Sequence, residues 1–193
     1  MYTQNIHGYH ISLVQCSEKP NHATEPLFEL DPSGCHRKTL SLTVEKDGCT
    51  RTCFFVVPCC TNVEACMLPT ETGLFFLFDW ILCLFNLESM TIGHSVTLNP
   101  TGTMFAPYPY QQDFILYGEV EIFRVRSDLS LVWSFSGWDI FVRSSGNEPA
   151  IVLKPDCICL YDFSDHSYEL DYDGNLLSTS LLSVPTQSIL GGI

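Results

Sequence analysis

Short segments in which hydrophobic and polar residues alternate run along most of the chain, for example residues 9–16, 40–44 and 158–163. Alternation with a period of two gives each segment one apolar face, and it predicts half-buried β-strands. No stretch of ten or more residues combines the apolar spacing of an amphipathic helix with helix caps. The pattern therefore predicts an all-β protein.

Further apolar segments complete the set of predicted strands. They are residues 52–57, 74–78, 81–87, 95–98, 114–117, 120–125, 131–135, 140–142, 150–153 and 168–172. Residues 52–57 are almost continuously apolar, which predicts burial on both faces. Residues 74–87 predict two buried strands around a tight connection, and they are shorter than the ~20 residues of a membrane-spanning helix. Residues 17–37, 58–72 and 100–112 predict loops.

Three segments repeat one pattern of an apolar strand, a polar or acidic turn and a second apolar strand. They are residues 80–92, 120–133 and 157–177, and Trp80 and Val120 lie about 40 residues apart, a spacing typical of propeller blades. Residues 80–177 locally resemble the blade repeats of pyrroloquinoline-quinone-type β-propellers. The resemblance implies architecture and transfers no cofactor-binding residue. We expect an antiparallel meander, propeller-like or a β-sandwich, with a small closed propeller as the alternative.

The chain has 193 residues, which suits one domain with a sizeable core. We expect a single all-β domain over residues 1–177, and an uncharged C-terminal tail or last strand over residues 178–193. The first eight residues lack the basic and apolar regions of a signal peptide. We therefore expect a cytoplasmic protein in which the ten cysteines stay reduced.

Acidic residues dominate the charge of the chain, with 22 Asp and Glu against 9 Lys and Arg and a formal net charge of −13. Phosphate groups would repel such a chain, which argues against binding to nucleic acid or to an anionic membrane. The charge suits a basic protein partner, and it also suits plain solubility. Exposed strand edges would allow a dimer.

Cysteine and histidine residues gather in the first part of the chain and form one candidate metal site. Its members would be Cys35, His36, Cys49, Cys53, Cys59 and Cys60. Zinc binds sulfur and imidazole, but the Cys-x2-Cys spacing of a zinc knuckle is missing. Packing explains these thiols better, and it also explains Cys157 and Cys159, which share one face of a strand. We expect no cofactor.

Aromatic residues next to turns form a candidate binding surface, because aromatic side chains on loops are common anchors of protein interfaces. Carboxylates on neighbouring turns would add negative charge. The set is Phe105, Tyr108, Tyr110, Trp138, Asp165, Asp171 and Asp173. The other interpretation of these aromatic residues is that they cover the end of a sheet.

Motifs of nucleophilic catalysis and of phosphate binding are missing from the sequence. We therefore expect a non-enzymatic protein-interaction module with an acidic surface, and an inhibitor or immunity protein is one form that it would take. The alternative is a small β-fold enzyme or ligand binder with a Cys/His site. Partner binding that weakens as salt rises would favour the interaction module. Loss of activity or stability with a chelator or an alkylating agent would favour the Cys/His site.

Overall fold

The computed structural model describes residues 2–16, 25–31, 34, 36–146 and 148–180, and all regular secondary structure in this part of the chain is β-strand. The strands form four sheets. Contacts between residues divide the chain into two compact units, Met1–Leu98 and Asn99–Ile193, with two sheets in each. The prediction of an all-β fold is confirmed.

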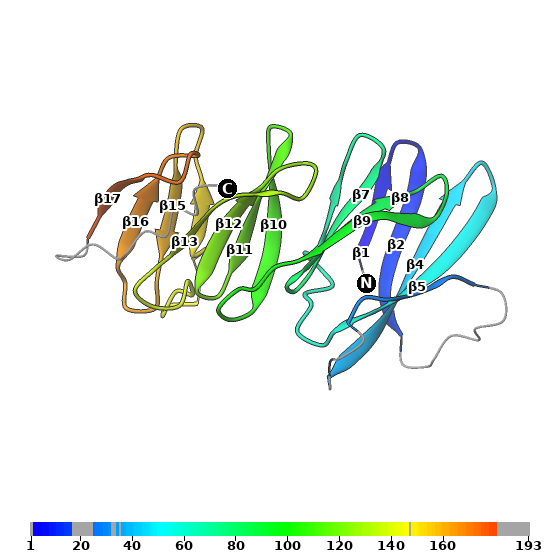
Figure 1. Ribbon diagram of the computed structural model, residues 1–193, viewed down its shortest axis with the longest axis horizontal. Helices are drawn as coiled ribbons and strands as arrows, with labels where there is room; N and C mark the ends of the chain where they lie inside the picture. Colours follow the sequence, from blue (N-terminus) through cyan, green and yellow to red (C-terminus); the bar gives the residue numbers. More distant parts are fainter. Residues whose placement is uncertain (1, 17–24, 32–33, 35, 147, 181–193) are drawn as a thin grey trace. The chain divides into compact units, whose positions relative to one another are not determined.

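The first unit contains a five-stranded and a four-stranded sheet (Figure 1). The five-stranded sheet has the order β1-β2-β4-β5-β3, and its strands are β1 (Tyr2–Ile6), β2 (Tyr9–Cys16), β3 (Leu27–Glu29), β4 (Arg37–Lys46) and β5 (Cys49–Pro58). The four-stranded sheet consists of β6 (Met67–Pro69), β7 (Gly73–Phe78), β8 (Ile81–Asn86) and β9 (Thr91–Thr97) in chain order. β3 pairs with β5 in parallel, and the other pairs are antiparallel.

Both sheets of the first unit contribute to one buried core. The ring of Phe55, on β5, lies 5.3 Å from the rings of Phe76 and Phe78 on β7, measured between centroids. Phe85, on β8, meets the same ring edge-on at 5.5 Å. Aromatic pairs at these separations are favourable beyond the area that they bury. Every residue of β7 is buried, which confirms that residues 74–87 form buried strands around a tight turn.

The second unit contains two four-stranded antiparallel sheets, each with its strands in chain order (Figure 1). One consists of β10 (Met104–Tyr110), β11 (Asp113–Gly118), β12 (Glu121–Val125) and β13 (Leu131–Ser136). The other consists of β14 (Ile151–Leu153), β15 (Ile158–Tyr161), β16 (Ser167–Leu170) and β17 (Leu176–Thr179). Both contribute to a second core, where the fully buried Phe141 lies edge-on to Tyr168, with 6.0 Å between ring centroids.

The three predicted repeats each include the hairpin between the third and fourth strands of a four-stranded sheet. The register of each hairpin shifts by one residue, between Leu84 and Phe85, between Arg124 and Val125 and between Glu169 and Leu170, so the second strand carries the extra residue of a bulge. Each turn contains a buried residue with positive φ, namely Met90 (56°), Leu129 (70°) and Gly174 (85°). A four-stranded antiparallel sheet is also the unit of a propeller blade. The local resemblance therefore holds for the individual sheets.

Several boundaries differ from the prediction. Residues 100–112 were expected to be a loop but contain β10, and the loops expected at 17–37 and 58–72 contain the short strands β3 and β6. Residues 140–142 are not a strand, because the amides of Phe141 and Val142 donate to the separate carbonyls of Glu119 and Ile140 and form no ladder. Residues 52–57 alternate between buried and partly exposed positions, so burial on both faces is wrong for that segment.

The expectation of a single domain over residues 1–177 concerns how the two units associate, and it stays a prediction. β17 ends at Thr179, two residues beyond the expected boundary, and residues 181–193 of the expected tail lie outside the described residues. In the described part of the chain, no helix has the length and apolarity needed to cross a membrane. The cytoplasmic location also stays a prediction.

Candidate functional site

The predicted Cys/His set is spread over different environments. Cys53 is buried in the core of the first unit, where burial raises the pKa of its thiol to about 12. Cys49, Cys59 and Cys60 are exposed, and the sulfur atoms of the last two lie 3.8 Å apart. Cys35 lies outside the described residues. The other members of the set, including His36, form no group of three close metal ligands within the described residues.

The aromatic residues expected on a loop lie instead along β10. The ring centroid of Phe105 is 5.3 Å from that of Tyr117, and Tyr108 packs against the core of the second unit. Tyr110 stacks on Tyr172 with 3.9 Å between centroids and 3° between ring planes. These three side chains therefore contact other residues of the second unit. Such contacts fit the interpretation that they cover the end of a sheet.

Arg124 holds the same end of the second unit together. Its guanidinium forms an ion pair with Asp113 at 2.7 Å and donates a hydrogen bond of 2.8 Å to the carbonyl of Tyr172. Asp173 is a more distant partner at 3.3 Å. The carboxylate of Asp171 accepts backbone N–H groups of its own turn, from Asp173 and from Asn175. Asp171 and Asp173, which were predicted as part of a binding surface, thus stabilise a turn and contact Arg124.

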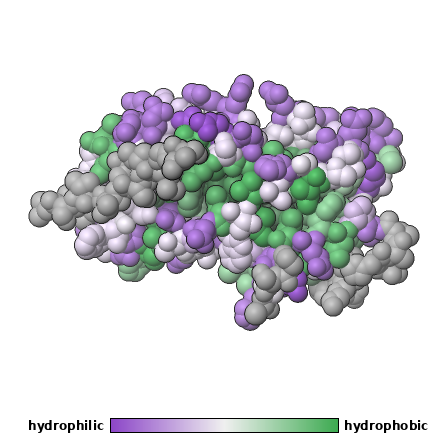
Figure 2. Space-filling model, viewed as in Figure 1, coloured by the Kyte–Doolittle hydropathy of each residue, from purple (hydrophilic) through white to green (hydrophobic). Residues whose placement is uncertain are grey.

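Exposed aromatic side chains lie at the opposite ends of the strands, on two loops of the second unit. Trp138, which follows β13, is 66% exposed, and Phe163, between β15 and β16, is 51% exposed. The face drawn in Figure 2 shows hydrophobic and hydrophilic residues side by side at the surface. A large exposed aromatic side chain on a loop is a feature of binding surfaces. Trp138 was predicted as such an anchor, and Phe163 was not.

Hydrogen bonds fix the backbone of both aromatic residues. The amide of Trp138 donates to the hydroxyl of Tyr168 at 2.8 Å, and the amide of Phe163 donates to the carbonyl of Ile140 at 2.8 Å. The two loops are also joined by their side chains, because the hydroxyl of Ser164 donates to Asp139 at 2.7 Å. We call Trp138, Asp139, Phe163, Ser164 and Asp165 the Trp138–Phe163 surface.

A buried carboxylate supports this surface from below. Asp162 is fully buried and accepts three hydrogen bonds, from the hydroxyl of Tyr168 at 2.7 Å and from the amide and Nδ1 of His166 at 2.9 and 3.0 Å. Burial and the neighbouring carboxylate raise the pKa of Tyr168, so its hydroxyl remains a donor to Asp162. The network ties the turn of Phe163 to the amide of Trp138. Nothing in the sequence pattern singled out Asp162 as buried.

Within the described residues, the carboxylates of the Trp138–Phe163 surface have no lysine or arginine as an ion-pair partner. The hydrogen bond from Ser164, followed by that from the amide of Ile140, lowers the pKa of Asp139. Asp165 accepts a longer bond of 3.4 Å from Ser144. The basic side chains of the second unit contact other groups, namely Arg124 with Asp113, Arg126 with Ser130, Arg143 with Glu148 and Lys154 with Glu169. Within the described residues, no lysine or arginine forms an ion pair with Asp139 or Asp165.

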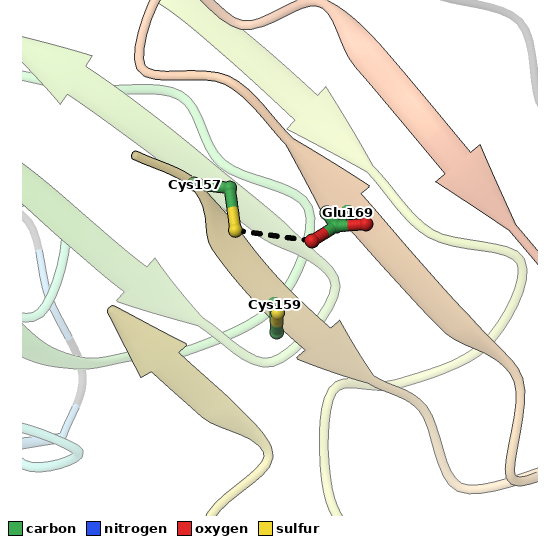
Figure 3. Close-up of side chains that lie close together, drawn as sticks. All are labelled: Cys157, Cys159 and Glu169. Atoms are coloured by element: carbon green, nitrogen blue, oxygen red, sulfur yellow. Dashed lines mark hydrogen bonds between the residues drawn. The ribbon is translucent and has the colours of Figure 1, made fainter. Parts of the chain in front are cut away.

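A separate group of potential metal ligands consists of Cys157, Cys159 and Glu169 (Figure 3). Their ligand atoms all lie within 4.8 Å of one another. The sequence had suggested packing for both cysteines, and the structure indeed buries them. It also places a carboxylate beside them, which sequence spacing alone did not predict.

Comparisons with known proteins show remote structural likeness and no family. No family model and no curated protein matches the sequence. The crystal structure of BamB from Moraxella catarrhalis is 12% identical with a TM-score of 0.49, over 79% of this chain and 51% of BamB. The CNH domain of AfRom2 is 11% identical with a TM-score of 0.39, over 92% of this chain and 52% of that one. The chain thus spans about half the length of these structures, and the likeness assigns no function.

Proposed function

We propose that the chain is a protein-interaction module, and that its Trp138–Phe163 surface binds a basic, partly apolar segment of another protein. The observation that carries the proposal is the pair of exposed aromatic side chains on a backbone fixed by hydrogen bonds. A surface that is already ordered loses less conformational entropy when a partner binds. Tryptophan in particular is enriched among the residues that dominate binding energy.

The chemistry of the partner follows from the charge around the two rings. Asp139 and Asp165 leave negative charge beside Trp138 and Phe163, and the chain as a whole carries −13. Lysine or arginine of the partner would complement the carboxylates, and arginine would also stack on an aromatic face. An inhibitor or immunity protein that meets a basic target in the cytoplasm is one form of this function.

The experiment is selection of a random displayed-peptide library on the immobilised full chain. We expect enriched peptides to combine arginine or lysine with an apolar residue. Trp138→Ser and Phe163→Ser should each weaken binding of a synthetic copy by about 30-fold, the loss typical of an aromatic hot spot. Leu177→Ser is the matched control, because Leu177 is 56% exposed in the same unit but lies on β17.

Salt provides a second measurement with the same peptide. Raising the salt from about 0.1 M to about 1 M shortens the Debye length from about 10 Å to about 3 Å, and binding should weaken accordingly. Failure to enrich any basic peptide would refute the proposal. Equal affinity of the wild type and the Trp138→Ser variant, with Leu177→Ser as the reference, would also refute it.

A further inference from the structure

The Cys157–Cys159–Glu169 group lies on the face of its sheet that points away from the core. Ile158 and Leu160 are fully buried in the core of the second unit, and residues alternate between faces along a strand. Cys157 and Cys159 therefore point to the other face. β16 pairs Glu169 directly with Cys159. Figure 3 shows Cys159 on β15, Cys157 just before this strand and Glu169 on the neighbouring β16, with the side chains close together.

Hydrogen bonds fix the carboxylate of Glu169 beside Cys157 before any ligand arrives. The sulfur of Cys157 donates a hydrogen bond of 3.1 Å to Oε1 of Glu169, and the other carboxylate oxygen accepts 3.0 Å from the hydroxyl of Ser178. The ammonium of Lys154 lies 3.8 Å from Oε1 of Glu169. Two thiols, a fixed carboxylate and a lysine thus meet at one point of the sheet.

This environment differs from that of the other buried cysteines. Cys53, Cys66 and Cys83 belong to the aromatic core of the first unit, and burial is the main cause that raises their pKa values to about 12. The pKa of Cys157 also rises to about 12, but here the main cause is its hydrogen bond to Glu169. The carboxylate that contacts the thiol of Cys157 also meets Lys154 and Ser178, and thiolates and carboxylates are both ligands for zinc.

The ligand atoms of the group all lie within 4.8 Å of one another, which is close enough for a shared metal ion. Residues two apart on a strand have Cα atoms roughly 6.6 Å apart, at the upper end of the range that a disulfide accepts. Tetrahedral zinc with Zn–S bonds of about 2.3 Å instead holds two sulfur atoms about 3.8 Å apart. The sulfur–oxygen separation across such a zinc ion is about 3.5 Å, close to the 3.1 Å between Cys157 and Glu169.

We propose that Cys157, Cys159 and Glu169 bind one zinc ion, with a fourth position left for water. Binding deprotonates both thiols, so the protons leave to solvent as the Zn–S bonds form. Two thiolates and a carboxylate carry three negative charges, which zinc and the nearby Lys154 ammonium balance. The site therefore needs no further charged ligand. The proposal does not depend on the Trp138–Phe163 surface.

The test is a titration of the reduced full chain with zinc against a chromophoric chelator. We expect one tight equivalent that releases protons to a dilute buffer. Cys157→Ser and Cys159→Ser should each weaken binding by at least about 100-fold, and Glu169→Gln by at least about 10-fold. The matched control is Cys59→Ser with Cys60→Ser, which removes the exposed neighbouring thiols of the first unit and should leave the tight equivalent unchanged.

Cobalt substitution keeps the proposal testable if a serine variant fails to fold. The wild-type chain loaded with one equivalent of Co²⁺ should show the visible bands of a tetrahedral ion and ultraviolet charge-transfer bands from two thiolates. Absence of tight zinc binding in the wild type would overturn the proposal. Loss of the tight equivalent in the Cys59→Ser/Cys60→Ser control, or a cobalt spectrum without thiolate bands, would overturn it as well.

Discussion

Replacing Gly174 by alanine tests how the turn between β16 and β17 packs on Trp133. Gly174 has a φ of 85°, and a Cβ atom placed on it would lie 2.7 Å from Cγ and 2.8 Å from Cδ2 of the tryptophan ring. Real contacts are not that short, so the ring or the turn must move. The ring has little freedom, because it is 6% exposed and its Nε1 donates 2.9 Å to the carbonyl of Tyr172.

The expected loss of stability has two parts. A non-glycine residue in the left-handed conformation costs about 1–2 kcal/mol. Overpacking against a buried side chain adds about 1–3 kcal/mol, so Gly174→Ala should lower the free energy of unfolding by about 2–5 kcal/mol. Gly146→Ala is the matched control in the same unit. Gly146 has a φ of 67°, and no atom lies within 4 Å of the position that a Cβ would take there, so only the conformational part applies.

Urea unfolding followed by tryptophan fluorescence measures both variants, and hydrogen exchange of residues 158–176 locates the effect. In a double-mutant cycle, Gly174→Ala should cost less when Trp133 is already replaced by leucine, because the ring that it meets is gone. Equal losses for Gly174→Ala and Gly146→Ala would refute the reasoning. So would an unchanged cost of Gly174→Ala in the leucine background.

Three further predictions concern hydrogen bonds and thiols. Asp162→Asn should lower the free energy of unfolding by about 2–3 kcal/mol, because the amide does not match the donors of Tyr168 and His166 that face the carboxylate. The exposed Asp165→Asn is the control and should change this free energy by no more than about 0.5 kcal/mol. Thermal unfolding measures both variants, and similar losses for the two would contradict the prediction. The Cys157–Glu169 hydrogen bond lowers the pKa of Glu169 from 4.5 and raises that of Cys157 from 9.0 to about 12. The contribution of this hydrogen bond to the free energy of unfolding should therefore be full between pH 4.5 and 9.0. It should vanish as the pH falls through the folded-state pKa of Glu169, and also as the pH rises through the folded-state pKa of Cys157. The difference in the free energy of unfolding between the wild type and Glu169→Gln, measured across pH on the metal-free chain, checks this prediction, and a difference that does not change with pH would count against it. Iodoacetamide should label the exposed thiols of the first unit in the native protein, and the three buried core thiols of that unit only after unfolding. Mass spectrometry locates the label, and labelling of the core thiols in the native protein would contradict their burial.

Most strands could be predicted from the sequence because their alternation is local information. The exceptions depended on position in the sheet. Pro107 and Pro109 made residues 100–112 look like a loop, because proline lacks the N–H that a strand ladder uses. β10 is an edge strand, where alternate residues direct their N–H away from the neighbour. The two prolines are two residues apart, so both can occupy such positions.

The candidate site was less accessible to sequence reasoning, since it depends on pairing across strands and loops. Trp138 was found from its aromatic character, but its connection to Phe163 exists only through hydrogen bonds between distant loops. The contact between Cys157 and Glu169 follows from the register of β15 and β16. The alternation of residues along each strand does not say which residues lie opposite each other on neighbouring strands. Knowledge of this register would have been needed to predict the contact.

The proline residues of β10 also bear on how the chain avoids self-association. An open strand edge normally offers a row of donors and acceptors to any extended segment, and this is a route to edge-to-edge aggregation. On β10, Pro107 and Pro109 remove two successive donors from such a row. An incoming strand would leave its matching carbonyl groups without partners. The sheet is therefore protected from templated growth at this edge by imino acids rather than by charge.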